Sequence, residues 1–193
     1  MDPGPGHHVR SSGVQHPLIL TLTGPPGCGK TTVCQRTISL ARSRGWRASG
    51  LLTVPRTSEV GTVGLDVEDI VSGERLALAE ERGPTDGPST ERWHFHRRAL
   101  EWGSACLGGA SPTDLLVIDE LGPLELMLGQ GWADGMSVLR EGRYSVAVVV
   151  VRPSLLSLYQ SRLPAMGAET LVVTADNRDQ LPLDLASLLG RSA

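Results

Sequence analysis

Apolar residues occur along this chain in short runs, separated by segments in which they recur every three or four positions. The short runs predict buried strands, at residues 17–23, 46–54, 114–122, 145–151 and 168–175. The segments between them predict helices, at residues 30–45, 93–109 (after an extended start), 131–142, 153–163 and 181–190. Strands that alternate with helices are typical of an α/β doubly wound sheet, mostly parallel, with helices on both faces.

One part of the pattern departs from this alternation. Residues 61–80 contain two extended segments around Ser72-Gly73, a turn sequence that favours a β-hairpin. We therefore expect an antiparallel hairpin added to the parallel sheet. The polar segment 82–89 that follows predicts a loop.

The pattern shows no internal repeat and no boundary between domains. Residues 17–193 are therefore expected to form a single domain, of a length that buries a substantial core. The first residues, 1–16, are rich in Gly, Pro, Ser and His and have the composition of a disordered tail.

Composition and net charge argue against nucleic acids and membranes as binding partners. The formal net charge of −3 lacks the basic excess of proteins that bind nucleic acids or anionic membranes. The chain has no apolar stretch long enough to predict a transmembrane helix, and its start has no apolar core of a signal peptide. Its three cysteines have no metal-binding spacing and favour reduced thiols. We expect a cytoplasmic protein without nucleic-acid or membrane partners, and the sequence names no protein partner.

A glycine-rich loop between the first predicted strand and helix is the strongest chemical signal. The chain has one lysine, Lys30, and residues 24–31 match G-x-x-x-x-G-K-[ST] at every fixed position. Glycines let successive backbone N–H groups surround a phosphate, and the helix N-terminus adds positive potential at the same place. Lys30 can reach the β- and γ-phosphates of a nucleotide, and Thr31 offers a hydroxyl to Mg²⁺.

Two acids complete this predicted site. Four apolar residues lead into Asp119 and Glu120, at the carboxyl end of a predicted strand. Ligands of open α/β sheets bind at that end, where an aspartate can hold Mg²⁺ directly or through water. The adjacent Glu120 can orient an attacking water or accept its proton. We therefore predict Lys30, Asp119 and Glu120 as catalytic residues, and Thr31 and Asp119 as metal ligands.

With these motifs placed, the chain resembles the small nucleoside-triphosphatases of the thermophile and cancer-related type. The resemblance covers roughly residues 18–189 and depends on the segments TGPPGCGKTT, SGLLTVPR with GTVGLDVEDIVSGERLALA, LLVIDELGPLEL and VVTADNRDQLP, in this order. It implies a RecA-like P-loop NTPase fold and Mg²⁺-dependent hydrolysis of ATP, GTP and other nucleoside triphosphates with loose base selectivity. Some members are also described as nucleoside or nucleotide kinases.

Further residues are candidates for contact with the nucleotide. Arg152 ends a predicted strand on the phosphate side and could sense the γ-phosphate or pair with an acid. Asn177 and Arg178 match a family motif and could touch the base or ribose. The roles of Glu125, Arg56 and residues 82–98 stay open. The predicted nucleotide-binding residues are Gly24, Pro25, Pro26, Gly27, Cys28, Gly29, Lys30, Thr31, Thr32, Arg152, Asn177 and Arg178.

Three functions are compatible with these residues. Slow hydrolysis of nucleoside triphosphates is the leading hypothesis, because a carboxylate next to the metal aspartate is what activation of water needs. The first alternative is a kinase that acts on a nucleoside or nucleotide, with an acceptor site near the arginines of residues 75–98. The second alternative is an ATP-gated switch or adaptor protein.

Overall fold

The computed structural model describes residues 17–59, 61–163 and 168–189, so the predicted tail at 1–16 lies outside the described residues. The strands are β1 (Leu18–Thr23), β2 (Ala48–Ser58), β3 (Gly61–Asp69), β4 (Arg75–Glu80), β5 (His94–Phe95), β6 (Leu115–Leu121), β7 (Val146–Val151) and β8 (Ala168–Val172). The helices are α1 (Lys30–Ser43), α2 (Arg97–Gly108), α3 (Pro123–Leu126), α4 (Ala133–Glu141), the 3₁₀ turn η1 (Pro153–Leu155), α5 (Leu156–Arg162) and α6 (Leu181–Leu189).

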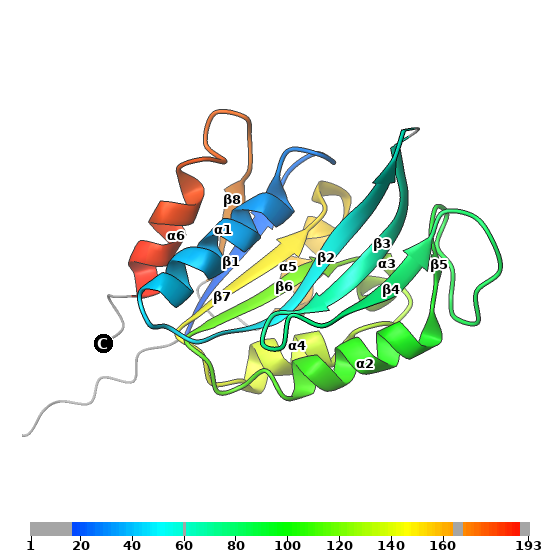
Figure 1. The fold of residues 1–193 in the computed structure, drawn as a ribbon. Coiled ribbons are helices and arrows are strands. Elements are labelled where there is room, and N and C mark those ends of the chain that lie inside the picture. Colours follow the sequence, from blue (N-terminus) through cyan, green and yellow to red (C-terminus); the bar gives the residue numbers. More distant parts are fainter. Residues whose placement is uncertain (1–16, 60, 164–167, 190–193) are drawn as a thin grey trace, which may run out of the picture.

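All eight strands join one twisted sheet in the order β5-β4-β3-β2-β6-β7-β1-β8 (Figure 1). In the half of the sheet that runs β2-β6-β7-β1-β8, all neighbouring strands are parallel. The pairs β2–β3, β3–β4 and β4–β5 in the other half are antiparallel. The predicted mixed sheet is confirmed. The antiparallel addition is one strand larger than the predicted hairpin, because His94 and Phe95 pair with Glu80 and Ala79.

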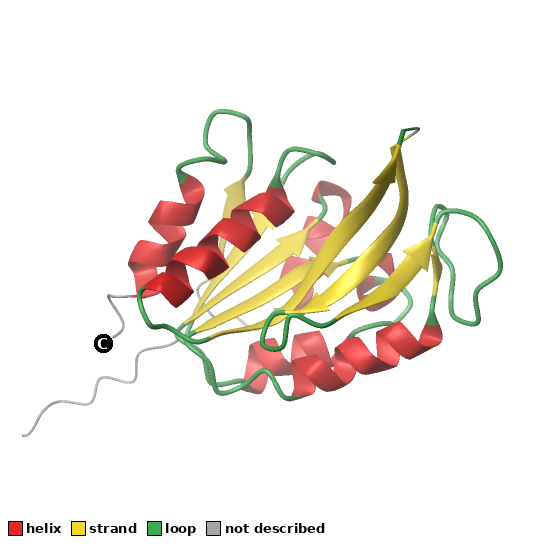
Figure 2. Cartoon of the chain, in the orientation of Figure 1, coloured by secondary structure: helices red, strands yellow, loops and turns green. Residues whose placement is uncertain are grey.

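Helices cover both faces of the sheet (Figure 2), and the central strand β7 shows why. Its six residues are all buried, and successive side chains of a strand point to opposite faces. Val146, Val148 and Val150 pack in a cluster with residues of α1 and α6. Ala147, Val149 and Val151 pack in the second cluster, with residues of α2 and α4. A continuous apolar run is therefore what a strand between two helical layers requires.

Most predicted elements are present, with shifted ends. Strand β2 runs to Ser58, four residues beyond its apolar run, because pairing with β3 continues there. Residues 123–126 form the short helix α3, where the sequence predicted only a loop. Within the described part of the chain, no helix combines the length and apolar composition needed to cross a lipid bilayer.

Candidate active site

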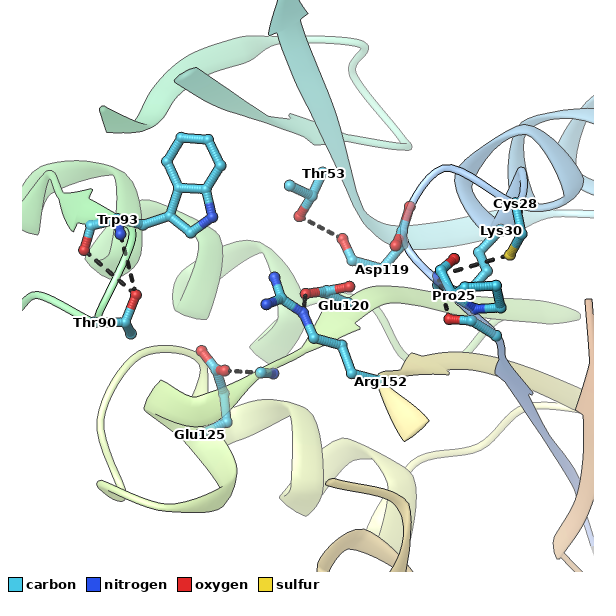
Figure 3. Close-up of polar contacts among 12 residues, drawn as sticks. Pro25, Cys28, Lys30, Thr53, Thr90, Trp93, Asp119, Glu120, Glu125 and Arg152 are labelled. Atoms are coloured by element: carbon cyan, nitrogen blue, oxygen red, sulfur yellow. Dashed lines mark hydrogen bonds and ion pairs between the residues drawn. The ribbon is translucent and has the colours of Figure 1, made fainter. Parts of the chain in front are cut away.

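The predicted phosphate-binding loop connects β1 to α1, as its sequence requires. Gly29 precedes the helix with a φ of 104°, a left-handed conformation that favours glycine, and Lys30 is the first helical residue. The Lys30 Nζ atom donates hydrogen bonds to the carbonyl oxygens of Gly24 at 2.9 Å and Pro25 at 3.0 Å (Figure 3). The lysine thus folds over its own loop, which keeps its charge at the predicted phosphate site. Thr32, in contrast, lies on the exposed side of α1.

The loop after β8 packs against this glycine-rich loop. A Cβ atom on Gly24 would lie 2.7 Å from the carbonyl oxygen of Val173, closer than real contacts permit. A Cβ atom on Gly29 would lie 3.4 Å from Cδ of Arg178. The structure therefore places Arg178 beside the predicted phosphate site.

Asn177, the other candidate from this loop, has its side chain engaged locally. Its Oδ1 accepts a hydrogen bond from the backbone N–H of Thr174, and its Nδ2 donates to the carbonyl of Val172, both at 2.8 Å. These bonds stabilise the loop between β8 and α6. They also use the Asn177 amide group, which the sequence suggested as a contact to the base or ribose of the nucleotide.

Asp119 combines deep burial with an incomplete set of partners. Its side chain is 2% exposed, and its Oδ2 atom has no hydrogen-bond partner among the described residues. The pKa of Asp119 is raised to about 7, mainly by burial and also by the nearby charge of Glu120, against a hydrogen bond with the Thr31 hydroxyl and the charge of Lys30, which lower it. A buried carboxylate is costly without a counter-charge. An unpartnered oxygen beside a hydroxyl is a donor set that Mg²⁺ prefers, so Asp119 and Thr31 fit the predicted metal site.

Glu120, the next residue, is paired with an arginine. Its Oε1 accepts a hydrogen bond from Nε of Arg152 at 2.6 Å, an ion pair in which both side chains are partly exposed. Arg152 follows β7, the neighbour of β6 in the sheet. Figure 3 shows Glu120 and Arg152 between the phosphate-binding loop on one side and Trp93 on the other. The sequence left open whether Arg152 senses the γ-phosphate or pairs with an acid, and in the structure it pairs with and orients Glu120, the predicted catalytic base.

Two residues with open roles are held by other parts of the fold. The Glu125 carboxylate accepts hydrogen bonds from the backbone N–H groups of Gly122 at 2.9 Å and Trp132 at 3.1 Å, and burial raises its pKa. It therefore stabilises the turn after β6. Arg56 forms ion pairs with Asp66 at 2.8 Å and Glu80 at 2.5 Å, which tie β2 to β3 and β4.

A cavity of about 390 Å³ lies next to the Glu120–Arg152 pair. Residues 90–93 and Phe95 line it together with Thr53, Leu65 of β3, Leu78 of β4 and the segment around α3. Arg92, one of the arginines of residues 75–98 near which the sequence suggested an acceptor site, is part of this lining. Thr53 contributes a contact that the sequence did not predict, because its hydroxyl donates to the backbone carbonyl of Asp119 at 2.6 Å. The aromatic residue Trp93, next to a polar segment, is a further sequence signal that points to this part of the chain.

Comparisons with known proteins identify the family of this chain. The model of a protein family described as NTPase matches residues 19–186. The chain belongs to the NTPase family. Among its relatives is the "Nucleoside-triphosphatase THEP1" of Methanosarcina acetivorans, 32% identical over 167 residues, which are 86% of this chain and 93% of the relative. The protein of the same name from Thermofilum pendens is also 32% identical, over 86% of this chain and 91% of the relative.

Solved structures of the NTPase family share the fold. The crystal structure of THEP1 from Aquifex aeolicus superposes with a TM-score of 0.65 at 22% identity, over 89% of this chain and 98% of the other. The solution structure of a human cancer-related nucleoside triphosphatase also gives 0.65, at 24% identity, over 90% and 98%. The resemblance to the thermophile and cancer-related type and the expected P-loop NTPase fold are thus confirmed.

The buried carboxylate of this NTPase family member predicts a pH-dependent stability. The folded pKa of Asp119, about 7, lies above the usual 3.8. A raised acid pKa means that the folded state binds the proton more tightly, so the metal-free protein loses stability as pH rises from about 4 to about 7. We expect Asp119→Asn to remove this loss, with a gain in free energy of unfolding about 2 kcal/mol larger at pH 8 than at pH 5.

Urea denaturation in EDTA at these two pH values measures the gain. Asp114→Asn is the matched control, because Asp114 is a partly exposed acid that pairs with Arg47 at 3.5 Å one residue before β6. A gain that is equal at both pH values for Asp119→Asn would show that its charge is not penalised in the fold.

Proposed function

We propose that this protein is a Mg²⁺-dependent nucleoside-triphosphatase that hydrolyses ATP, GTP and other nucleoside triphosphates slowly and with loose base selectivity. The observation that carries the proposal is the position of Asp119. A buried carboxylate with an unpartnered oxygen touches the Thr31 hydroxyl, next to Lys30 and one residue before Glu120. The names of the relatives, nucleoside-triphosphatases, support the same class of reaction.

Each part of the site has a role in hydrolysis. Backbone N–H groups of residues 24–31 and the Lys30 ammonium group would hold the triphosphate. Thr31 and Asp119 would hold Mg²⁺, which neutralises charge on the phosphate oxygens when it is bound. Glu120, oriented by Arg152, would position a water molecule and accept its proton as the water oxygen attacks the γ-phosphorus. The bond from the γ-phosphorus to the bridging oxygen breaks, and its electron pair leaves on the nucleoside diphosphate.

Two features support slow and unselective turnover. Arg152 is paired with Glu120 at 2.6 Å, so its positive charge is not free for the γ-phosphate. P-loop enzymes without such an arginine in place hydrolyse slowly. The Asn177 amide, a group that could read the edge of a base, makes two hydrogen bonds within its own loop.

A panel of ATP, GTP, CTP and UTP, each with Mg²⁺ or with EDTA, tests the proposal by the release of inorganic phosphate. We expect all four to be hydrolysed, at rates within about tenfold of one another and below roughly one per second, and EDTA to stop the reaction. Phosphate release that persists in EDTA, or that is absent with every nucleotide, would contradict the proposal.

A further inference from the structure

Asp119 and Glu120 lie where the regular pairing of the sheet is interrupted. On one side of β6, pairing with β2 ends at Ile118, whose partner is Leu51. On the other side, pairing with β7 passes from Ile118 directly to Leu121. Within the described part of the chain, neither strand therefore supplies a register partner for the two acids. Regular strand pairing thus does not set the position of the peptide group that links them.

The hydroxyl of Thr53 supplies a contact at this interruption. It donates a hydrogen bond of 2.6 Å to the backbone carbonyl oxygen of Asp119, which belongs to the peptide group before Glu120 (Figure 3). The donor is itself well placed, because Thr53 pairs with Val67 in the antiparallel ladder between β2 and β3. Its β-branched side chain also has few rotamers in a strand. A paired part of β2 is thus joined to the part of β6 that lacks register partners.

The two acids depend on this hydrogen bond to different degrees. The carboxylate of Asp119 is buried and has a hydrogen bond with the Thr31 hydroxyl, so the start of α1 also holds it. The Glu120 side chain is partly exposed, and its partner Arg152 is partly exposed as well. The position of such a carboxylate depends on the direction in which its side chain leaves the backbone. The bond from Thr53 acts on that direction, because it holds the peptide group at which Glu120 begins.

From these contacts we infer that Thr53 is a positioning residue for hydrolysis, because its hydroxyl fixes the peptide group that directs Glu120 toward the attacking water. This inference rests on the proposed role of Glu120 as the base. The hydroxyl itself takes no part in the making or breaking of bonds. Its loss acts on the chemical step and leaves the binding of the triphosphate by residues 24–31 unchanged. A displacement of about 1 Å at a catalytic group can lower a rate about a hundredfold.

Thr53→Val tests the inference, because valine keeps the shape of threonine and removes the hydroxyl. We expect kcat for ATP with Mg²⁺ to fall at least about tenfold, while KM and the dissociation constant of a nonhydrolysable ATP analogue change less than about threefold. Thr53→Ser keeps the hydroxyl and should hold kcat within about threefold of the unmodified chain. In the Glu120→Gln background, Thr53→Val should lower kcat by less than about twofold, since both changes act through the same carboxylate.

Thr113→Val is the matched control. Thr113 also donates a hydrogen bond from its hydroxyl to a backbone carbonyl, that of Arg47 at 3.0 Å, but it precedes the amino end of β6 and the acids lie near the carboxyl end. This variant should leave kcat within about twofold. Urea denaturation in EDTA should show one cooperative unfolding transition for both valine variants, so that a lower kcat of Thr53→Val is not a result of unfolding.

A loss of kcat below about tenfold in Thr53→Val, or a Thr53→Ser variant as slow as Thr53→Val, overturns the positioning role. A full tenfold loss that persists in the Glu120→Gln background also overturns it, because the hydroxyl would then act through another group. Each of these results leaves the proposed hydrolysis standing, whereas absence of phosphate release by the unmodified chain would overturn the proposed function itself.

Discussion

Lys30→Ala is expected to lower kcat/KM for every nucleoside triphosphate at least about a hundredfold and to weaken nucleotide binding. The chain has no second lysine, and the 17 arginines that make up the rest of its basic residues cannot replace a compact ammonium group within the loop. Phosphate release under saturating Mg²⁺, together with the dissociation constant of a nonhydrolysable ATP analogue, measures both effects.

The same substitution should cost little stability, which separates a catalytic role from a structural one. Lys30 donates to the carbonyls of Gly24 and Pro25 and to Sγ of Cys28, all on a loop that water can reach, so the free energy of unfolding should change by less than about 1 kcal/mol. Lys30→Arg keeps the charge but should remain impaired. Arg36→Ala, which removes an exposed pair with Asp179, should retain activity. Hydrolysis by Lys30→Ala near the wild-type rate would remove the lysine from the mechanism.

Local signals in the sequence were sufficient to place the glycine-rich loop and the two acids. The loop at residues 24–31 follows β1, and Asp119 and Glu120 lie at the carboxyl end of β6, the end at which ligands of open α/β sheets bind. The apolar run of β7 likewise identified a central strand, because both of its faces are covered by helices. In each of these cases the residues of one segment are enough to predict where that segment lies in the fold.

Contacts between segments that are distant in the sequence could not be predicted from these local signals. Arg56 meets Asp66 and Glu80 only because β2, β3 and β4 pair in one register, and a shift by one residue would turn the side chains to opposite faces. Arg152 reaches Glu120 because the carboxyl ends of the neighbouring strands β6 and β7 meet at one edge of the sheet, and the sequence does not show which side chains pair there. The cavity beside Glu120 likewise depends on residues 90–95, β3, β4 and the turn after β6 meeting in space.

Glu120→Gln is expected to slow hydrolysis about a hundredfold or more while the enzyme still binds ATP. Glutamine keeps the shape of the side chain, and its amide oxygen can still accept the hydrogen bond from Nε of Arg152. It lacks the negative charge that accepts a proton from the attacking group. Single-turnover measurements of phosphate release, with the binding of a nonhydrolysable analogue in parallel, separate the chemical step from affinity.

The control is Glu91→Gln, an exposed acid in the lining of the same cavity that lies outside β6. It makes the same change of charge and should leave hydrolysis within about twofold, because solvent screens an exposed carboxylate. A rate of hydrolysis by Glu120→Gln within a few-fold of wild type would exclude Glu120 as the base.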